Sequence, residues 1–138
     1  MKYIGLDLGT KTLGIAFSDP LGMIASSYKI IRHNEDYEQL VKEVEQLMKD
    51  ENASEIVLGL PKNMNNTIGE RATKSYYFKE LLEKELNVVV HLEDERLSTR
   101  EAENLLISND TSRKKRKKVI DSLAATIILQ SFLDKKGR

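Results

Sequence analysis

The chain has 138 residues, which fits one domain with a single hydrophobic core, and its formal net charge is zero. It contains no cysteine, which excludes disulfides and thiolate zinc sites. No signal-peptide pattern and no apolar run of about 20 residues is visible. We therefore expect a cytoplasmic protein with no membrane partner.

The neutral total conceals a separation of charge along the chain. Residues 111–138 contain nine Lys/Arg and two Asp/Glu, whereas the remainder contains 13 basic and 20 acidic residues. The run RKKRKK at 113–118 could bind a polyanion. Such a run is also typical of a solvated loop, and we expect a mobile loop over 108–118.

Strands are predicted to open the chain. Alternating apolar residues predict strands at 2–8 and 13–18, joined by the short turn Gly9–Thr12. A third antiparallel strand is expected at 23–32 after the turn sequence DPLG.

Helices and buried strands then alternate. Apolar residues at i, i+3 and i+4 predict an amphipathic helix, and short apolar runs predict strands buried on both faces. Two capping-box patterns, at Thr67–Glu70 and Ser98–Glu101, predict helix starts. The expected elements are a helix at 36–49, a strand at 55–60, a helix to about 86, a strand at 87–92, a helix to about 107 and an apolar last helix at 119–133.

The resulting order is βββαβαβαα in one domain spanning 1–138. It predicts an α/β fold in which a mixed five-stranded sheet is flanked by helices, the ribonuclease H-like order.

Carboxylates stand out at three places with apolar or turn-like surroundings. Asp7 ends the first strand, Glu93-Asp94-Glu95 follows the fifth, and Asp121 opens the apolar last helix. Sites in open α/β sheets gather at the carboxyl ends of parallel strands. We therefore expect Asp7 and the acidic segment at one edge, where the last helix could bring Asp121.

Three carboxylates without cysteine suit Mg²⁺ or Mn²⁺, which prefer oxygen ligands. Such metals can clamp the attacking and leaving oxygens of a phosphodiester. Each acid also has a simpler interpretation: Asp7 could hydrogen-bond its turn, the acidic segment could be a solvated loop, and Asp121 could favour a helix N-terminus.

Basic residues and histidines complete the candidates. Lys11, Arg71 and Arg96 are possible phosphate contacts, together with the basic run. His91 is expected to be a satisfied core residue and His33 an exposed turn residue, so that a zinc site is not predicted.

These residues together resemble the YqgF family of bacterial proteins, described as Holliday-junction-resolvase-like and as pre-16S ribosomal RNA nucleases. The matching segments are GLDLGTKTLGIAFSDPLG at 5–22, IVLGLPKNMNNTIGERA at 56–72, EDERLSTREAE at 93–103 and KVIDSLAATIILQSFL at 118–133.

The resemblance implies a ribonuclease H-like fold and a metal-dependent nuclease. It implies catalytic, metal-binding acids at Asp7, within the DER of 94–96 and at Asp121. Within DER we favour Glu95, with Asp94, Arg96 and Thr10 in supporting roles, although the strand pattern leaves Asp94 and Glu95 open. The nucleic-acid contacts expected are Lys11, Arg71, Lys114, Lys115, Arg116 and Lys117.

The substrate implied is structured RNA, above all the 5′ end of pre-16S ribosomal RNA, with ribosomal precursor particles as partners. Branched DNA is the alternative, for a Holliday junction resolvase, and a non-catalytic RNA-binding scaffold is another. The protein is expected to be a monomer or a homodimer. DLGTK at 7–11 is also similar to the phosphate loop of sugar kinases and actin-like ATPases, but those need two such domains.

Overall fold

The computed structural model describes residues 1–60, 70–94 and 113–136. At the helix starts bordering the gaps, residues 70–71 and 113–122 are described by their backbone alone. Among the helices described, none combines the length and the apolar character needed to cross a membrane.

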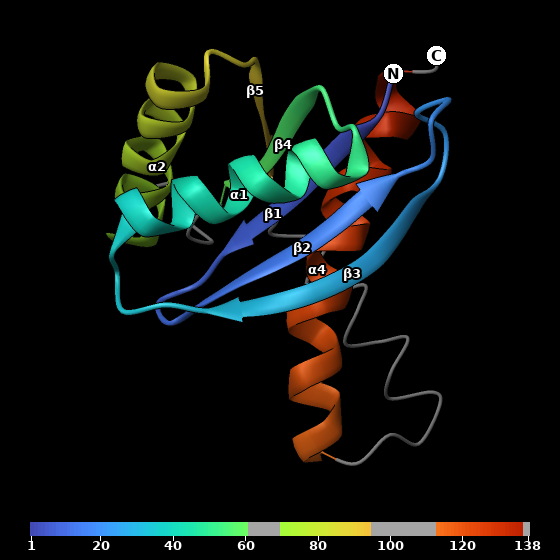
Figure 1. Cartoon of the computed structure of the whole chain (residues 1–138). Coiled ribbons are helices and arrows are strands. Elements are labelled where there is room, and N and C mark those ends of the chain that lie inside the picture. Colours follow the sequence, from blue (N-terminus) through green and yellow to red (C-terminus); the bar gives the residue numbers. More distant parts are fainter. Residues whose placement is uncertain (61–69, 95–112, 137–138) are drawn as a thin grey trace.

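A five-stranded mixed sheet forms the centre of the fold (Figure 1). Its strand order is β3-β2-β1-β4-β5, in which β1 to β3 are antiparallel neighbours and β4 and β5 extend the sheet in parallel with β1. The predicted mixed sheet is thereby confirmed. The strands are β1 (Tyr3–Leu8), β2 (Thr12–Ser18), β3 (Ala25–Arg32), β4 (Glu55–Leu60) and β5 (Val90–Asp94).

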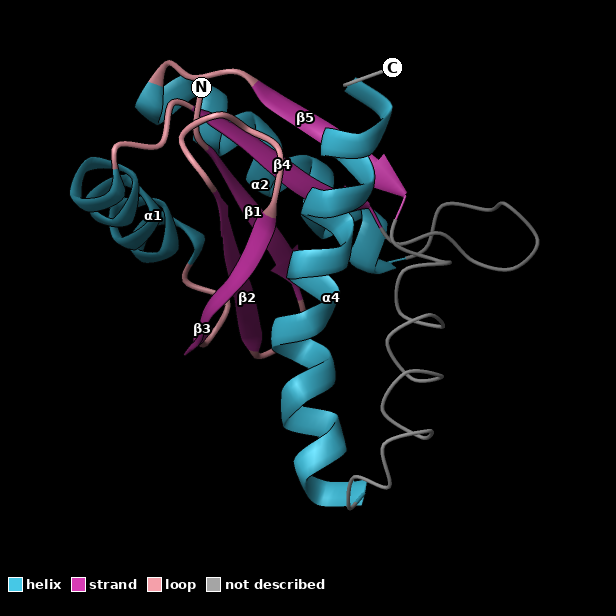
Figure 2. Cartoon of the chain, turned by 90° about the vertical axis from the view of Figure 1, so that its right-hand side faces the viewer, coloured by secondary structure: helices cyan, strands magenta, loops and turns pink. Residues whose placement is uncertain are grey.

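Helices cover both faces of this sheet. Helices α1 (Tyr37–Glu51) and α2 (Glu70–Leu86) pack on one face, and α4 (Arg113–Lys136) packs on the other. Figure 2 shows α1 and α4 on opposite sides of the sheet. The crossovers through α1 and α2 make β1, β4 and β5 parallel, so their carboxyl ends meet at one edge.

The alternation of β1 divides the core between the two faces. Ile4, Leu6 and Leu8 are buried against α1 and α2, whereas Tyr3 is buried against α4. Each fully buried side chain of this size stabilises the fold by about 1.5–3 kcal/mol. The same alternation assigns Asp7 to the α4 face, because it follows Tyr3 by four residues.

The fifth strand begins later than predicted, at Val90. Asn87 donates its backbone N–H to the Glu83 carbonyl at 3.1 Å and adopts a left-handed φ of 54°, which ends α2. Val89 is exposed in the connection that follows. The strand also ends two residues later than predicted, at Asp94.

The basic run does not form the loop that we expected at this place. Helix α4 begins at Arg113, so residues 113–118 are its first turns. The physical reason is that Lys and Arg are good helix formers, and a polar composition alone does not predict a loop. The helix predicted over 98–107 and the helix start predicted at 67 lie outside the described residues.

Candidate functional site

Asp7 occupies the last but one position of β1 and pairs with Gly14 of β2. Its side chain is half-buried, and its Oδ1 atom is shielded from solvent. Shielding a carboxylate oxygen is costly unless hydrogen bonds, an opposite charge or a metal compensates for the lost hydration. The position is thus suited to a functional acid.

The register of the parallel strands brings Asp7 and the acidic segment to the same edge. Leu6 pairs with Leu58, and Gly59 pairs with Glu93. One step beyond Leu6, Asp7 is level with Gly59 and hence with Glu93. Because neighbouring strands are spaced by 4.7–4.9 Å, the backbones of Asp7 and Glu93 are about 10 Å apart.

Alternation along β5 separates the acids of this segment. His91 contacts the Phe132 ring of α4 at a centroid distance of 4.7 Å, and Glu93 accepts a hydrogen bond from Ser131 of α4 at 3.5 Å. Val90 and Leu92 pack with the core on the other face. Side chains two residues apart on a strand share a face, so Asp94 lies on the same face as Val90 and Leu92. This is the face opposite Asp7.

Glu93 shares the face of Asp7 but is engaged by α4. Its side chain is 6% exposed and forms an ion pair with Lys135. Glu93 therefore links β5 to the last helix.

Helix α4 runs antiparallel to β1 and carries Asp121 toward Asp7. The rings of Tyr3 and Phe132 lie 5.5 Å apart, and a Cβ on Gly5 would lie 3.1 Å from the Ala125 carbonyl oxygen. Moving along β1 from Tyr3 to Gly5 thus moves back along α4 from Phe132 to Ala125. Asp121 lies one turn before Ala125, and Asp7 lies two residues after Gly5. The α4 backbone therefore places Asp121 near the level of Asp7.

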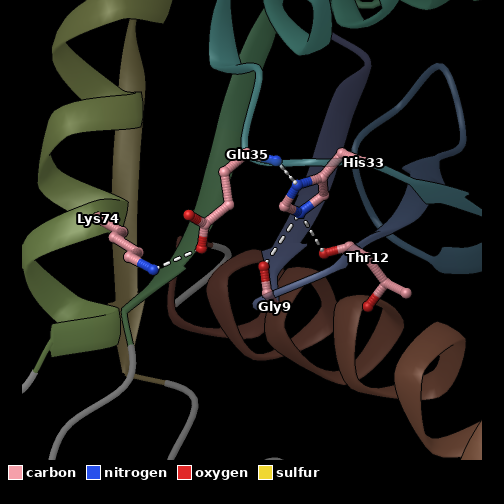
Figure 3. Close-up of polar contacts among 5 residues, drawn as sticks. All are labelled: Gly9, Thr12, His33, Glu35 and Lys74. Atoms are coloured by element: carbon pink, nitrogen blue, oxygen red, sulfur yellow. Dashed lines mark hydrogen bonds and ion pairs between the residues drawn. The ribbon is translucent and has the colours of Figure 1, made fainter.

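The turn after β1 is held by His33 (Figure 3). Gly9 donates its N–H to the Thr12 carbonyl at 2.8 Å, and His33 Nε2 lies 3.1 Å from Gly9 O and 3.2 Å from Thr12 O. The Glu35 backbone N–H donates to His33 Nδ1 at 3.0 Å. The expectation that His33 is simply exposed is wrong: the side chain is half-buried and bonded at both nitrogens.

Lys74 of α2 approaches the same turn. It lines a small cavity with Leu8, Gly9 and Thr10, and its Nζ lies 2.5 Å from Glu35 Oε1. This hydrogen bond and the positive charge of Lys74 hold the pKa of Glu35 below its ordinary value of 4.5. No pattern in the sequence identified Lys74, because its place depends on how α2 packs.

The remaining predicted residues divide between described and undescribed parts of the chain. Thr10 and Lys11 are exposed on the β1–β2 turn. His91 Nε2 contacts Glu55 Oε1 at 2.7 Å, so His91 is satisfied as predicted, although it is half-buried rather than in the core. Arg71 lies in the first turn of α2, Lys114, Lys115, Arg116 and Lys117 lie in the first turns of α4, and Glu95 and Arg96 lie outside the described residues.

The described side chains do not by themselves complete a metal site. Among them, no group of three or more His, Asp or Glu could hold a metal ion. Two of the three predicted ligands, Glu95 and the side chain of Asp121, lie outside that set. The ligand set predicted from the sequence therefore stays a prediction.

A family model described as "RuvX: Holliday junction resolvase" matches residues 1–135. The chain belongs to the RuvX family. This match covers all four segments that carried the resemblance to YqgF proteins, and that resemblance is confirmed.

Relatives of this RuvX-family chain match over nearly its full length. Proteins named "Putative pre-16S rRNA nuclease" are 51% identical in Lactiplantibacillus plantarum and 51% identical in a Geobacillus species. The first match covers 100% of this chain and 97% of the relative, and the second covers 99% of each. A protein of the same name from Listeria monocytogenes is 50% identical, with 97% and 98% covered.

Solved structures confirm the ribonuclease H-like fold. Thermus thermophilus RuvC, solved in complex with a Holliday junction substrate, matches with a TM-score of 0.61 at 13% identity, over 99% of this chain and 96% of that chain. A hexokinase of the ROK family from the same organism matches with a TM-score of 0.50 at 22% identity, over 75% of this chain but only 38% of its own. The likeness to a sugar kinase is therefore confined to part of the kinase.

Proposed function

We propose that this RuvX-family protein is a metal-dependent nuclease that hydrolyses phosphodiester bonds in structured nucleic acid, and that its substrate is the 5′ end of pre-16S ribosomal RNA. The observation that carries the chemistry is Asp7, a carboxylate with a shielded oxygen at the carboxyl edge of the parallel strands. The choice of substrate is supported by the names of full-length relatives at about 50% identity.

Asp7, Glu95 and Asp121 would hold Mg²⁺ or Mn²⁺. The donor set fits such ions, because it consists of carboxylate oxygens only and the chain has no thiolate to attract a softer metal. When bound, the metal would offset the negative charge that develops at the phosphodiester during hydrolysis. The protein's part is to hold Asp7 on a rigid strand and Asp121 on the helix packed against it.

The face of β5 supports Glu95 as the second ligand. Residues 91 and 93 of β5 face α4, and in the sequence Glu95 continues this odd-numbered alternation. Asp94 belongs to the opposite face, and Glu93 is engaged by Lys135. We retain Asp94, Arg96 and Thr10 as supporting residues around the ligands rather than as ligands.

Basic residues near this edge would hold the substrate backbone. The first turns of α4, which carry Lys114, Lys115, Arg116 and Lys117, extend past the sheet in Figure 1. Lys11 is exposed on the turn that follows Asp7, and Arg71 starts α2. A helix with several positive charges suits the phosphates of a duplex or folded RNA. The substrate would place the protein in the cytoplasm, with precursor particles as partners.

A cleavage assay tests this function. Labelled RNA spanning the 5′ end of 16S precursor RNA and a four-way DNA junction are each incubated with Mg²⁺, with Mn²⁺ or with chelator. We expect metal-dependent cleavage of the RNA, lost in Asp7→Asn and Glu95→Gln. Binding of the RNA without cleavage under all conditions would instead support a scaffold and contradict the proposal.

Junction resolution remains the second candidate because the family model carries that description. A junction has two-fold symmetry, so a resolvase is expected to act as a symmetric dimer. Selective cleavage of the junction by a dimeric protein, with the RNA left intact, would establish this second function in place of the first.

A further inference from the structure

We propose that His33 is a positioning residue for the site around Asp7: it fixes the turn Gly9–Thr12 that directly follows this acid. The inference rests on the proposed function, because it takes Asp7 to be a metal ligand. It adds a residue from the β3–α1 connection to the surroundings of Asp7.

His33 binds three of the four residues of the turn. Its backbone N–H donates to Lys11 O at 2.9 Å, and its Nε2 lies within 3.2 Å of Gly9 O and Thr12 O. The Thr12 carbonyl also accepts the Gly9 N–H at 2.8 Å. The carbonyl oxygens at the two ends of the turn thus lie within hydrogen-bond distance of the same ring nitrogen.

The hydrogen bonds determine which tautomer can do this. Nδ1 accepts the Glu35 backbone N–H, so it carries no proton in this arrangement. The single ring proton of the neutral imidazole is therefore on Nε2, where it is shared between Gly9 O and Thr12 O. Each nitrogen then has the role that its partner requires.

The imidazole is itself held in place from two sides. Glu35 adopts a left-handed φ of 63°, which is uncommon for a residue with a side chain, and its carboxylate is bound by Lys74 at 2.5 Å. The Tyr37 ring lies 6.0 Å from the imidazole between centroids. Figure 3 shows the resulting connection from the turn through His33 and Glu35 to α2.

This connection matters because Asp7 is only two residues from Gly9. A turn free to move would let the end of β1 and the exposed Thr10 and Lys11 change position relative to α4. Groups that hydrogen-bond directly to metal ligands typically contribute 10–100-fold to metal affinity or activity. His33 bonds the turn that follows Asp7 and not Asp7 itself, so we expect the loss of the Nε2 donor to weaken metal binding at Asp7 by the lower end of this range, about 10-fold.

Two substitutions of His33 separate its two nitrogens. His33→Gln keeps an N–H near the position of Nε2 and can still donate to Gly9 O and Thr12 O. His33→Asn has an amide near Nδ1 and is too short to reach either carbonyl. We expect His33→Asn to weaken Mn²⁺ affinity, measured by titration with electron paramagnetic resonance, by about 10-fold, and His33→Gln to restore most of it.

Two readouts are independent of catalysis. In the unaltered protein, the ¹⁵N shifts of the imidazole should report the tautomer protonated at Nε2. Hydrogen exchange at the Gly9 amide should be slow in the unaltered protein and in His33→Gln but fast in His33→Asn. Thermal unfolding of both variants serves as the control for folding.

The outcomes distinguish this inference from the proposed function. Equal Mn²⁺ affinity and equal Gly9 exchange in His33→Asn and the unaltered protein would overturn the positioning role, as would a proton on Nδ1 in the native protein. Failure of Asp7→Asn to alter Mn²⁺ binding would instead contradict the proposed metal site. If His33→Asn does not fold, the ¹⁵N shifts and Gly9 exchange of the unaltered protein and His33→Gln still decide the question.

Discussion

Gly5 of β1 lies directly against Leu129 of α4: a Cβ added to Gly5 would stand 2.8 Å from Leu129 Cβ and 3.1 Å from the Ala125 carbonyl oxygen. No side chain fits in this gap without movement of the helix. The close approach therefore sets the separation between the strand that carries Asp7 and the helix that carries Asp121.

Gly5→Ala is expected to push α4 away from β1. Overpacking at such a position costs about 1–3 kcal/mol, and we expect a loss of unfolding free energy of this size in chemical denaturation. Cleavage activity should fall further than the folded fraction does, because the two acids separate. The matched control for Gly5→Ala is Ser27→Ala. This substitution removes a 2.7 Å hydroxyl hydrogen bond between β3 and Thr126 of α4 but adds no bulk between sheet and helix.

Shortening the partner should not rescue Gly5→Ala. The closest atoms are the Leu129 Cβ and the Ala125 carbonyl oxygen, both of which persist in Leu129→Ala. If the double variant regains the stability and activity of the unaltered protein, the clash is with the flexible end of Leu129, and the backbone of α4 does not set the separation.

The first turns of α4 are expected to bind phosphates. Neutralising Lys114, Lys115, Arg116 and Lys117 to Gln keeps helix formers in place and removes four positive charges. RNA affinity should fall, and the slope of log affinity against log salt should flatten by about 0.7–0.9 for each phosphate that the variant no longer binds. The slope is measured by filter binding between about 50 and 200 mM salt. An unchanged slope would show that these residues do not touch the substrate.

Glu93 and Glu95 are expected to respond differently to the same substitution. Glu93 is paired with Lys135, which is 66% exposed, so Glu93→Gln should cost about 1 kcal/mol of stability and leave the metal dependence of cleavage intact. Glu95→Gln should abolish cleavage with little loss of stability. The reverse result would identify Glu93 as the second metal ligand.

The Glu35–Lys74 ion pair is expected to make the stability of the fold fall at acidic pH. Lys74 holds the pKa of Glu35 below 4.5, so the pair contributes stability above that pH and loses it as the pH falls through the lowered pKa. The melting temperature of Glu35→Gln should lie below that of the unaltered protein at about pH 6, and the gap should close toward about pH 3.

Lys74→Met provides the control for this prediction. Without Lys74 the pKa of Glu35 loses its main cause of depression and keeps only the smaller effect of His33, so the change in melting temperature caused by Glu35→Gln should differ much less between the two pH values. A pH-dependent gap that persists without Lys74 would assign the effect to another group.

The fold could be predicted from the sequence because its elements are marked by regular patterns. Alternation identified β1 and β2, and the short apolar run at 55–60 coincides with β4. The start of β5 is not marked in the sequence, because Val88 and Val89 suit a strand as well as Val90 does and the left-handed conformation of Asn87 is not visible in composition. The basic run was expected to be a loop because it is highly charged, but Lys and Arg are also good helix formers.

The candidate site could be predicted only in part, for a related reason. Asp7 was conspicuous because its neighbours in β1 are apolar, and strand order then accounts for the common edge with the acidic segment. His33 and Lys74 gave no such signal, since their roles depend on backbone carbonyls and on helix packing. Interactions of this kind arise from tertiary geometry and leave no periodicity in the sequence.

Single-turnover cleavage of RNA carrying the 5′ extension of 16S precursor RNA, compared between the unaltered protein and Asp7→Asn at saturating protein, tests Asp7 as a catalytic metal ligand most directly. We expect cleavage that requires Mg²⁺ or Mn²⁺ and falls at least about 100-fold in Asp7→Asn, because a lost metal ligand removes several kcal/mol of transition-state stabilisation. RNA affinity should be preserved in the variant. Cleavage by Asp7→Asn at the rate of the unaltered protein, or cleavage that continues in chelator, would contradict a catalytic metal bound at Asp7.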